Sequence, residues 1–341
     1  MARTQYDTDP ARHSGPSWRA QRHSCSRWRW LVLSMLTAGC GSGGINSAPP
    51  PIVGTPTPPS APPASVSPFP GSSPSTYFLT DEVTAAAAVQ IDRSNGTARV
   101  TGVERLTNVL TPNRSHISVG YLGPDSYYVE TNGFGGSGFL PVEREDSSPL
   151  FDTYRSKDKG GYVDILQVAK KGTGIPLTYM SFGSYGFLTT SGANSELTLS
   201  FLAIGSRTPA SQMPTTGTAR FSGIVDGLWG DGATSRRLYG STATLTADFV
   251  AGRVTSILAL AGRDNPFGDF QSAPTTSLGT FTGTATISAG GFAGSYDASN
   301  GYSGPFSGHF YGPGAEEYGL GFSLSGGTNQ TAIGVAVGKR D

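Results

Sequence analysis

The sequence predicts an all-β protein, in which a small strand-rich handle region precedes an eight-stranded antiparallel up-and-down β-barrel. The 341 residues include 48 glycines and 24 prolines, whereas charged residues make up only 14%. That balance is typical of many short strands joined by tight turns. Apolar and polar residues also alternate with period two through most of the C-terminal half. Short turn sequences separate the alternating runs, which favours hairpins that follow one another along the chain.

The clearest alternation lies in residues 239–249, where the odd positions are apolar or small and the even positions are Gly, Thr, Thr, Thr and Asp. Period two over eleven residues predicts a strand with one buried face. The predicted barrel strands are residues 218–225, 239–249, 254–260, 280–287, 292–296, 305–311, 317–324 and 331–337. Consecutive hairpins of this kind close into a barrel without exposed edges. Because one face is mainly Thr, Ser and Gly, we expect the apolar side chains to fill the interior rather than to face lipid.

Residues 76–210 are expected to form the handle-like β-rich region, and residues 211–341 the barrel. Within the first region, residues 79–91 read LTDEVTAAAAVQI. A helix-capping Thr80, acidic residues in the first turn and a run of alanines predict a short helix there. The strand-like runs that follow are separated by Gly, Pro, Asn and Asp.

The N-terminus has the features of a secretion signal. Residues 27–40 read RWRWLVLSMLTAGC, with a basic flank, a short apolar run and small residues before Cys40. Cys40 after Ala-Gly resembles the bacterial lipobox, so residues 1–39 are expected to be removed and Cys40 to be lipidated. Two or more acyl chains give a stable anchor. The alternative is an ordinary secretory signal with an incidental cysteine.

Residues 40–75 are expected to combine the lipidated Cys40 with a linker, because eleven prolines fall between Pro49 and Pro74. Such a segment forms an extended, semi-rigid spacer and cannot bury a core. Gly41 is not the aspartate associated with inner-membrane retention, which favours the outer membrane. A lipid anchor followed by a spacer of this kind predicts a domain that is held away from the membrane and displayed at the cell surface.

Composition argues against several functions. The formal net charge is +0, which gives no electrostatic basis for binding nucleic acid. Cys25 and Cys40 are the only cysteines, so the folded part has neither a thiol nucleophile nor a cysteine zinc site. His116 and His309 are expected to be solvent-facing or hydrogen-bonded, the alternative being a metal or haem ligand. We therefore expect no catalysis, no cofactor and no metal.

Two adjacent acids, Glu316 and Glu317, follow a Gly-Pro-Gly turn. Neighbours on a strand point to opposite faces, so they cannot converge on a substrate as a general acid and base. We expect one carboxylate to be buried against backbone amides or an arginine, and the other to lie in water.

Four segments of the chain have recognisable motifs: GHFYGPGAEEYGLGFSL at 308–324, MPTTGTARFSG at 213–223, LTADFVAGRVTS at 245–256 and YMSFGSYGF at 179–187. Together they resemble the transferrin-binding protein B family of surface lipoproteins. The sequence departs from the family pattern at Phe221, where Tyr is usual, and at Ser256, where Gly is frequent.

The resemblance implies a lobe that pairs a strand-rich handle with an eight-stranded barrel, and this chain has room for one lobe. It also implies a lipoprotein anchored at the outer-membrane surface that binds a host or environmental protein or a small solute without catalysis. An iron- or haem-related ligand, such as a haem carrier, is among the ligands that the resemblance implies. Passing of cargo to an outer-membrane transporter is implied in the same way. Transferrin itself is not implied, because the loops do not match.

Large aromatic residues in polar segments are candidates for partner contacts. They are Tyr127, Tyr128, Phe134 and Phe139 in the handle region, and Phe267 and Phe270 in a barrel loop. The alternative for the first four is that they form the core of the handle. Arg236 and Arg237 in the first barrel hairpin are candidates for polar contacts at the rim of such an interface.

Two other functions remain open at this point. One is a structural envelope lipoprotein that carries no cargo. The other is a hydrolase of envelope polymers, which the lack of a convincing nucleophile or convergent acid pair disfavours.

Overall fold

The computed structural model describes residues 76–92, 97–105, 117–131, 135–145, 148–156, 160–191, 194–299, 301–327 and 329–341. The predicted signal, Cys40, the proline-rich linker, His116 and Phe134 lie outside these ranges. No helix in the described part is both long and apolar enough to cross a membrane.

The C-terminal sheet is a closed antiparallel barrel, which confirms the predicted fold class. Eight strands follow one another in chain order, and β12 pairs with both β14 and β20 to close the ring. The ring strands are β12 (Thr218–Gly230), β14 (Thr242–Asp248), β15 (Arg253–Arg263), β16 (Thr275–Ser288), β17 (Gly291–Ser299), β18 (Tyr302–Tyr311), β19 (Glu317–Ser325) and β20 (Thr331–Arg340). A short strand, β13 (Ser235–Arg237), pairs with β12 and β15 at one end.

The barrel interior is filled by the inward side chains of its own strands. On β14, Ala243, Leu245 and Ala247 are buried in the main core cluster, whereas Thr242 and Thr246 are exposed. The predicted alternation therefore sets the inside and the outside of the wall.

Two further sheets precede the barrel, and we call them the large and small handle sheets. The large sheet has the order β3-β2-β11-β10-β9-β8-β7, and the small sheet has the order β1-β4-β5-β6. The large-sheet strands are β3 (Thr97–Arg105), β2 (Asp81–Asp92), β11 (Asn194–Gly205), β10 (Met180–Ser191), β9 (Tyr162–Ala169), β8 (Phe151–Arg155) and β7 (Arg144–Glu145). The small-sheet strands are β1 (Thr76–Leu79), β4 (Ile117–Gly123), β5 (Ser126–Thr131) and β6 (Gly135–Phe139), and two 3-10 turns are η1 (Pro141–Glu143) and η2 (Ala210–Gln212).

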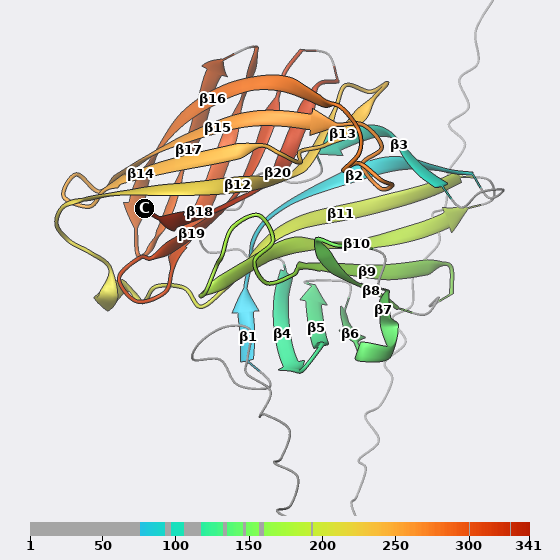
Figure 1. The fold of residues 1–341 in the computed structure, drawn as a ribbon, viewed down its shortest axis with the longest axis horizontal. Helices are drawn as coiled ribbons and strands as arrows, with labels where there is room; N and C mark the ends of the chain where they lie inside the picture. Colours follow the sequence, from blue (N-terminus) through green and yellow to red (C-terminus); the bar gives the residue numbers. More distant parts are fainter. Residues whose placement is uncertain are drawn as a thin grey trace, which may run out of the picture. The chain divides into compact units, whose positions relative to one another are not determined.

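The large handle sheet lies between the small sheet and the barrel (Figure 1). One of its faces shares a core cluster with outward side chains of the barrel wall, including Ile333, Val335 and Val337 of β20. Its other face shares a cluster with the small sheet, to which Tyr127 and Phe139 contribute. The barrel wall is therefore apolar on both sides where it meets the handle.

The helix expected at residues 79–91 is wrong, because this segment forms the end of β1 and most of β2. β2 pairs with β11 on one side and β3 on the other, and Ala85 and Ala87 are buried in the cluster shared with the barrel. Small side chains allow close approach of β2 to the barrel. Tertiary packing thus overrides the helical propensity of alanine.

Glycines on β19 show how closely the two layers approach. A Cβ added to Gly321 would lie 3.0 Å from the backbone oxygen of Glu82 on β2, and one added to Gly319 would lie 2.7 Å from Cε of Met180. The absence of a side chain lets Gly321 approach the handle backbone directly and lets Gly319 pack against handle side chains.

Candidate binding surface at the loop end of the barrel

The longer barrel connections gather at one end, which we call the loop end. It comprises residues 231–241, 264–274 and the described residues of 326–330. The connections at the opposite end are residues 249–252, 289–290 and 312–316, and none of them is as long as the loops at 231–241 and 264–274. Long loops on a rigid scaffold are where binding residues concentrate.

Arg236 of β13 lies over an aromatic ring at the loop end. Its guanidinium carbon is 5.1 Å from the centroid of the Trp229 ring, and its Nε forms a 2.9 Å ion pair with Asp264 Oδ1. The Trp229 indole in turn donates to the Tyr302 hydroxyl at 3.0 Å. The arginine side chain remains 20% exposed and that of Asp264 63% exposed, so a partner can reach both charges.

A second stack lies beside it. The guanidinium carbon of Arg263 is 5.2 Å from the Tyr239 ring centroid, and the rings of Tyr239 and Phe270 meet edge to face at 5.3 Å. Nη1 of Arg263 donates to the carbonyl of Gln271, which holds the loop that carries Phe270. All three stacked side chains are half-buried. Rigid, partly exposed aromatic and arginine side chains are the residue types that dominate protein interfaces.

The predicted rim contact by Arg237 is wrong, because this side chain is only 3% exposed. Its Nε and Nη2 donate to the two carboxylate oxygens of Asp226, each at 2.6 Å, and the guanidinium lies 5.4 Å from the Phe201 ring centroid. Burial raises the pKa of Asp226, and the adjacent Arg237 opposes that shift. The alternation of a β-strand explains the outcome, since neighbouring Arg236 and Arg237 point to opposite faces.

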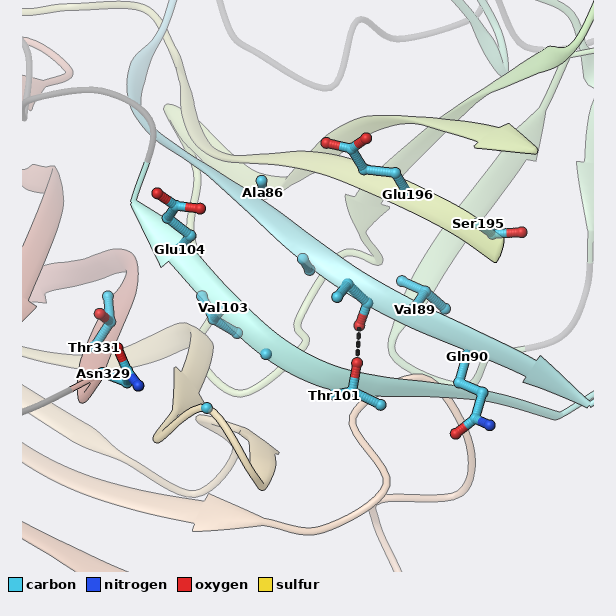
Figure 2. Close-up of a pocket in the computed structure, with 14 residues that line it drawn as sticks. Ala86, Val89, Gln90, Thr101, Val103, Glu104, Ser195, Glu196, Asn329 and Thr331 are labelled. Carbon is cyan, nitrogen blue, oxygen red and sulfur yellow. Dashed lines mark hydrogen bonds between the residues drawn. The ribbon is translucent and has the colours of Figure 1, made fainter. Parts of the chain in front are cut away.

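The loop end joins the edge of the large handle sheet. Ser235 Oγ donates to the carbonyl oxygen of Val100 on β3 at 2.6 Å. Beside this contact lies an open groove of about 1060 Å³ (Figure 2). It is lined by β2, β3 and the start of β11, and by Gly232, Asn329 and Thr331, the first residue of β20. A second hollow of about 570 Å³ lies between Arg99 of β3 and the Arg236–Asp264 pair.

The groove has the chemistry of a contact surface. The alanines of β2 and Gly102 form a small-residue floor, and Glu104 and Glu196 stand on either side of it (Figure 2). Thr101 donates to the carbonyl oxygen of Ala88 at 3.2 Å, so its hydroxyl is held within the sheet. The described residues lining the groove include no histidine or cysteine, and across all described residues no three His, Cys, Asp or Glu side chains approach as metal ligands would.

The structure separates the remaining predicted contact residues. Tyr127 and Phe139 are 9% and 0% exposed in the cluster between the two handle sheets, which is the alternative weighed from the sequence. Tyr128 is half-buried, and Phe267 is half-buried against the cluster shared by handle and barrel. Phe270 therefore joins Arg236 at the loop end, whereas the handle aromatics lie elsewhere.

Glu317 is the buried acid of the adjacent pair, as expected. Its carboxylate accepts hydrogen bonds from the backbone N–H groups of Thr178, Tyr179 and Met180 at 2.6, 2.9 and 3.1 Å. Burial raises its pKa, and the three amide bonds oppose that shift. Glu316 is half-buried rather than fully in water.

His309 is hydrogen-bonded, as expected. Its Nδ1 lies 2.6 Å from Asp81 Oδ1, and the Tyr311 hydroxyl donates to Asp81 Oδ2, also at 2.6 Å. Arg207 approaches the same carboxylate at 3.4 Å. This cluster ties β18 of the barrel to β2 of the handle.

Sequence reasoning missed the Asp81 cluster, the Asp226–Arg237 pair and the groove. A signal for Asp226 was present, because it is a single acid within the apolar run Ile224–Trp229, which begins at the end of the predicted strand 218–225. The groove could not be found, because its floor was expected to be a helix.

The barrel matches a known family. The family described as "C-lobe and N-lobe beta barrels of Tf-binding protein B" matches residues 213–340. The resemblance drawn from the sequence motifs is therefore confirmed over the barrel. No curated protein matches the chain in sequence.

Solved structures of similar proteins include two transferrin-binding protein B molecules. The protein from Haemophilus parasuis, a Tyr-to-Ala and Trp-to-Ala double mutant, is 19% identical over 76% of this chain and 45% of its own, with a TM-score of 0.42. The protein from serogroup B Neisseria meningitidis is 21% identical over 76% of this chain and 50% of its own, with a TM-score of 0.37. A structure described as a surface lipoprotein is 14% identical over 76% of this chain and 99% of its own, with a TM-score of 0.34. The chain spans about half the length of the two transferrin-binding protein B structures.

Proposed function

From the match of residues 213–340 to the transferrin-binding protein B barrels, we propose that this chain is a surface lipoprotein that binds another protein through the loop end. Cys40 is its lipid anchor, residues 41–75 are its spacer, and the outer membrane is its location. The family match is the observation that carries the proposal. The lipobox-like sequence before Cys40 supports the anchor independently.

The geometry favours binding over catalysis. The barrel interior is occupied by its own aromatic and aliphatic side chains, so chemistry in the lumen has no room. At the loop end, Arg236 and Arg263 stack on aromatic rings, which holds large side chains in place before a partner arrives. Preorganised anchors of this kind reduce the entropy lost on association.

The partner class follows from the family with one restriction. The related structures are named for binding transferrin, but this chain spans about half their length. We therefore assign a host or environmental protein, a haem carrier included, as the class of ligand. Delivery of its cargo to an outer-membrane transporter completes the proposed role.

The test is affinity capture with the full chain carrying Cys40→Ser, offered growth medium, serum and envelope extract. A loop-end variant with Arg236→Ala and Phe270→Ala removes one exposed cation and one aromatic contact. The matched control is Val250→Ser, which lies on the β14–β15 turn at the opposite end and is 73% exposed.

We expect the unaltered chain and the Val250→Ser variant to capture the same partner. The double variant should bind that partner at least tenfold more weakly. That loss corresponds to about 1.4 kcal/mol of binding free energy. A partner retained equally by all three proteins would place binding elsewhere, and capture of no protein at all would contradict the function.

A further inference from the structure

The small handle sheet exposes an apolar patch at one end. Leu122, Leu140 and Val142 are 39%, 51% and 85% exposed. They are three of the six large hydrophobic side chains that are exposed among the described residues. Pro124 and Pro141 are exposed beside them. We call these five residues the foot patch.

Strand register brings the patch together. Tyr121 of β4 pairs with Tyr127 of β5, which pairs with Phe139 of β6. Leu122, within β4, and Leu140, just after β6, each follow that row by one residue, so they lie at the same end of the sheet. Arg144, just beyond η1, forms a 3.3 Å ion pair with Asp125 in the β4–β5 turn, which holds the η1 segment next to that turn.

The chain enters the sheet at this same end. Thr76, the first residue of β1, pairs with Tyr121. The start of β1, the β4–β5 turn and η1 all lie along the lower edge of the sheet in Figure 1. Thr76, where the described chain begins, therefore lies at the end of the sheet that carries the foot patch.

Residues 61–75, APPASVSPFPGSSPS, suit this patch in composition. They carry no charge, and Phe69 stands between Pro68 and Pro70. Proline lacks a backbone N–H and cannot extend a sheet, but proline-rich segments dock onto apolar surfaces in the polyproline II conformation. We propose that this segment folds back onto the foot patch, with Phe69 packed on Leu140 and Val142.

Distance and tethering permit the contact. Phe69 lies seven positions before Thr76, a span that at about 3.1 Å per residue reaches roughly 20 Å. Three strand spacings of about 4.8 Å separate β1 from β6, roughly 14 Å. A short tether gives a local concentration on the order of millimolar, so a weak contact is well populated.

The charges near the foot patch favour docking of the uncharged residues 61–75 over docking of an anionic membrane surface. Asp125, Glu143 and Glu145 lie within three residues of the patch along the chain, and the nearby cation Arg144 pairs with Asp125 and Asp152. An acidic rim repels an anionic lipid surface, whereas it does not repel an uncharged segment. Docking of residues 61–75 would fix the direction in which the handle extends from the proposed lipid anchor. This docking does not depend on the proposed partner binding.

The test uses the lipidated full chain in its native membrane. Val142 is replaced by p-benzoylphenylalanine, and illumination is followed by mass mapping of the adducts. The matched control places the same photo-crosslinker at Val250 of the β14–β15 turn. Adducts within residues 61–75 are expected from position 142 and not from position 250.

A second pair of variants tests the role of the aromatic ring. Phe69→Ser is expected to lower the adduct yield several-fold, and Ser72→Ala is expected to leave it unchanged. The proposal would be overturned if position 142 formed adducts with lipid or with another polypeptide, or formed none at all. It would also be overturned if position 250 gave an equal yield, or if Phe69→Ser left the yield from position 142 unchanged.

Discussion

At the scale of single residues, buried charges fix the barrel to the handle. Glu317 accepts three backbone hydrogen bonds from the segment leading into β10, and Arg237 holds both oxygens of Asp226 within the packed layers. A carboxylate that accepts several amide bonds satisfies donors that would otherwise be buried without partners. These residues therefore act in folding rather than in the binding of a ligand.

Glu317→Ala leaves the N–H groups of Thr178, Tyr179 and Met180 without their acceptor. We expect a loss of about 1–3 kcal/mol in the free energy of unfolding, measured by urea denaturation. Glu143→Ala serves as control, because that carboxylate accepts a single amide bond in an exposed turn. Equal effects of the two substitutions would contradict the role given to Glu317.

The raised pKa of Glu317 predicts a pH dependence with a definite sign. Because the native state binds this proton more tightly than the unfolded chain does, the stabilisation is present below the unfolded pKa, about 4.3. It is lost as pH rises through the native pKa. Compared with Glu317→Gln, which does not titrate, the wild-type free energy of unfolding should fall as pH rises from 4. A wild-type free energy of unfolding that rises with pH relative to that of Glu317→Gln would contradict the raised pKa of Glu317.

Arg237→Ala should leave the Asp226 carboxylate buried without its ion-pair partner. Removing one partner of a buried ion pair lowers the free energy of unfolding by about 3–5 kcal/mol. The neighbouring Arg236→Ala breaks a partly exposed pair, for which about 0–1 kcal/mol is expected. Denaturation of both variants in parallel checks the assignment, which similar losses for the two arginines would refute.

At the scale of elements, the sequence predicts the barrel strands well and the handle less well. On β14 the Ala and Leu side chains face the barrel interior and the Thr side chains face outward. The period-two pattern alone therefore identifies this strand. On β2 the run of alanines carries helical propensity, and only its pairing with β3 and β11 makes it a strand. Partners that are distant in sequence cannot be inferred from local pattern.

The loop end was only partly predictable for a related reason. Phe270 and Arg236 were identified by residue type, but the sequence could not say that Arg237 turns inward to Asp226 on β12. The groove beside β3 depends on Ser235 meeting Val100, a contact across more than a hundred residues.

Gly321→Ala tests how closely β19 lies on β2. The added Cβ would sit 3.0 Å from the carbonyl oxygen of Glu82, so we expect about 1–3 kcal/mol of destabilisation from the forced separation. Gly138→Ala is the matched control, because a Cβ there meets nothing within 4 Å. Thermal unfolding of both variants gives the comparison, and an unchanged midpoint for Gly321→Ala would mean that the layers separate without strain.

At the scale of the whole molecule, we propose a lipid anchor that is joined to a rigid β-scaffold presenting its loops. The anchor rests on the sequence before Cys40, and the scaffold rests on the closed ring from β12 to β20. A ring without free edges is suited to exposure outside the cell, because it offers no strand for edge-to-edge aggregation.

Cys40→Ser should release the chain from the membrane. A diacylglyceryl thioether requires the cysteine sulfur. The proposed anchor consists of the acyl chains on Cys40, so the serine variant should lose it. Fractionation and detergent partitioning of the full chain measure the effect. Cys25→Ser is the control and should leave partitioning unchanged, whereas a membrane-bound Cys40→Ser variant would contradict lipid anchoring.

The most direct test of partner binding at the loop end is hydrogen–deuterium exchange of the chain, free and bound to a captured partner. We predict that protection appears in residues 231–241 and 264–274 and is absent from the β14–β15 turn. Protection confined to the outer Thr-rich wall of β14 to β16, or to the small handle sheet, would contradict the account.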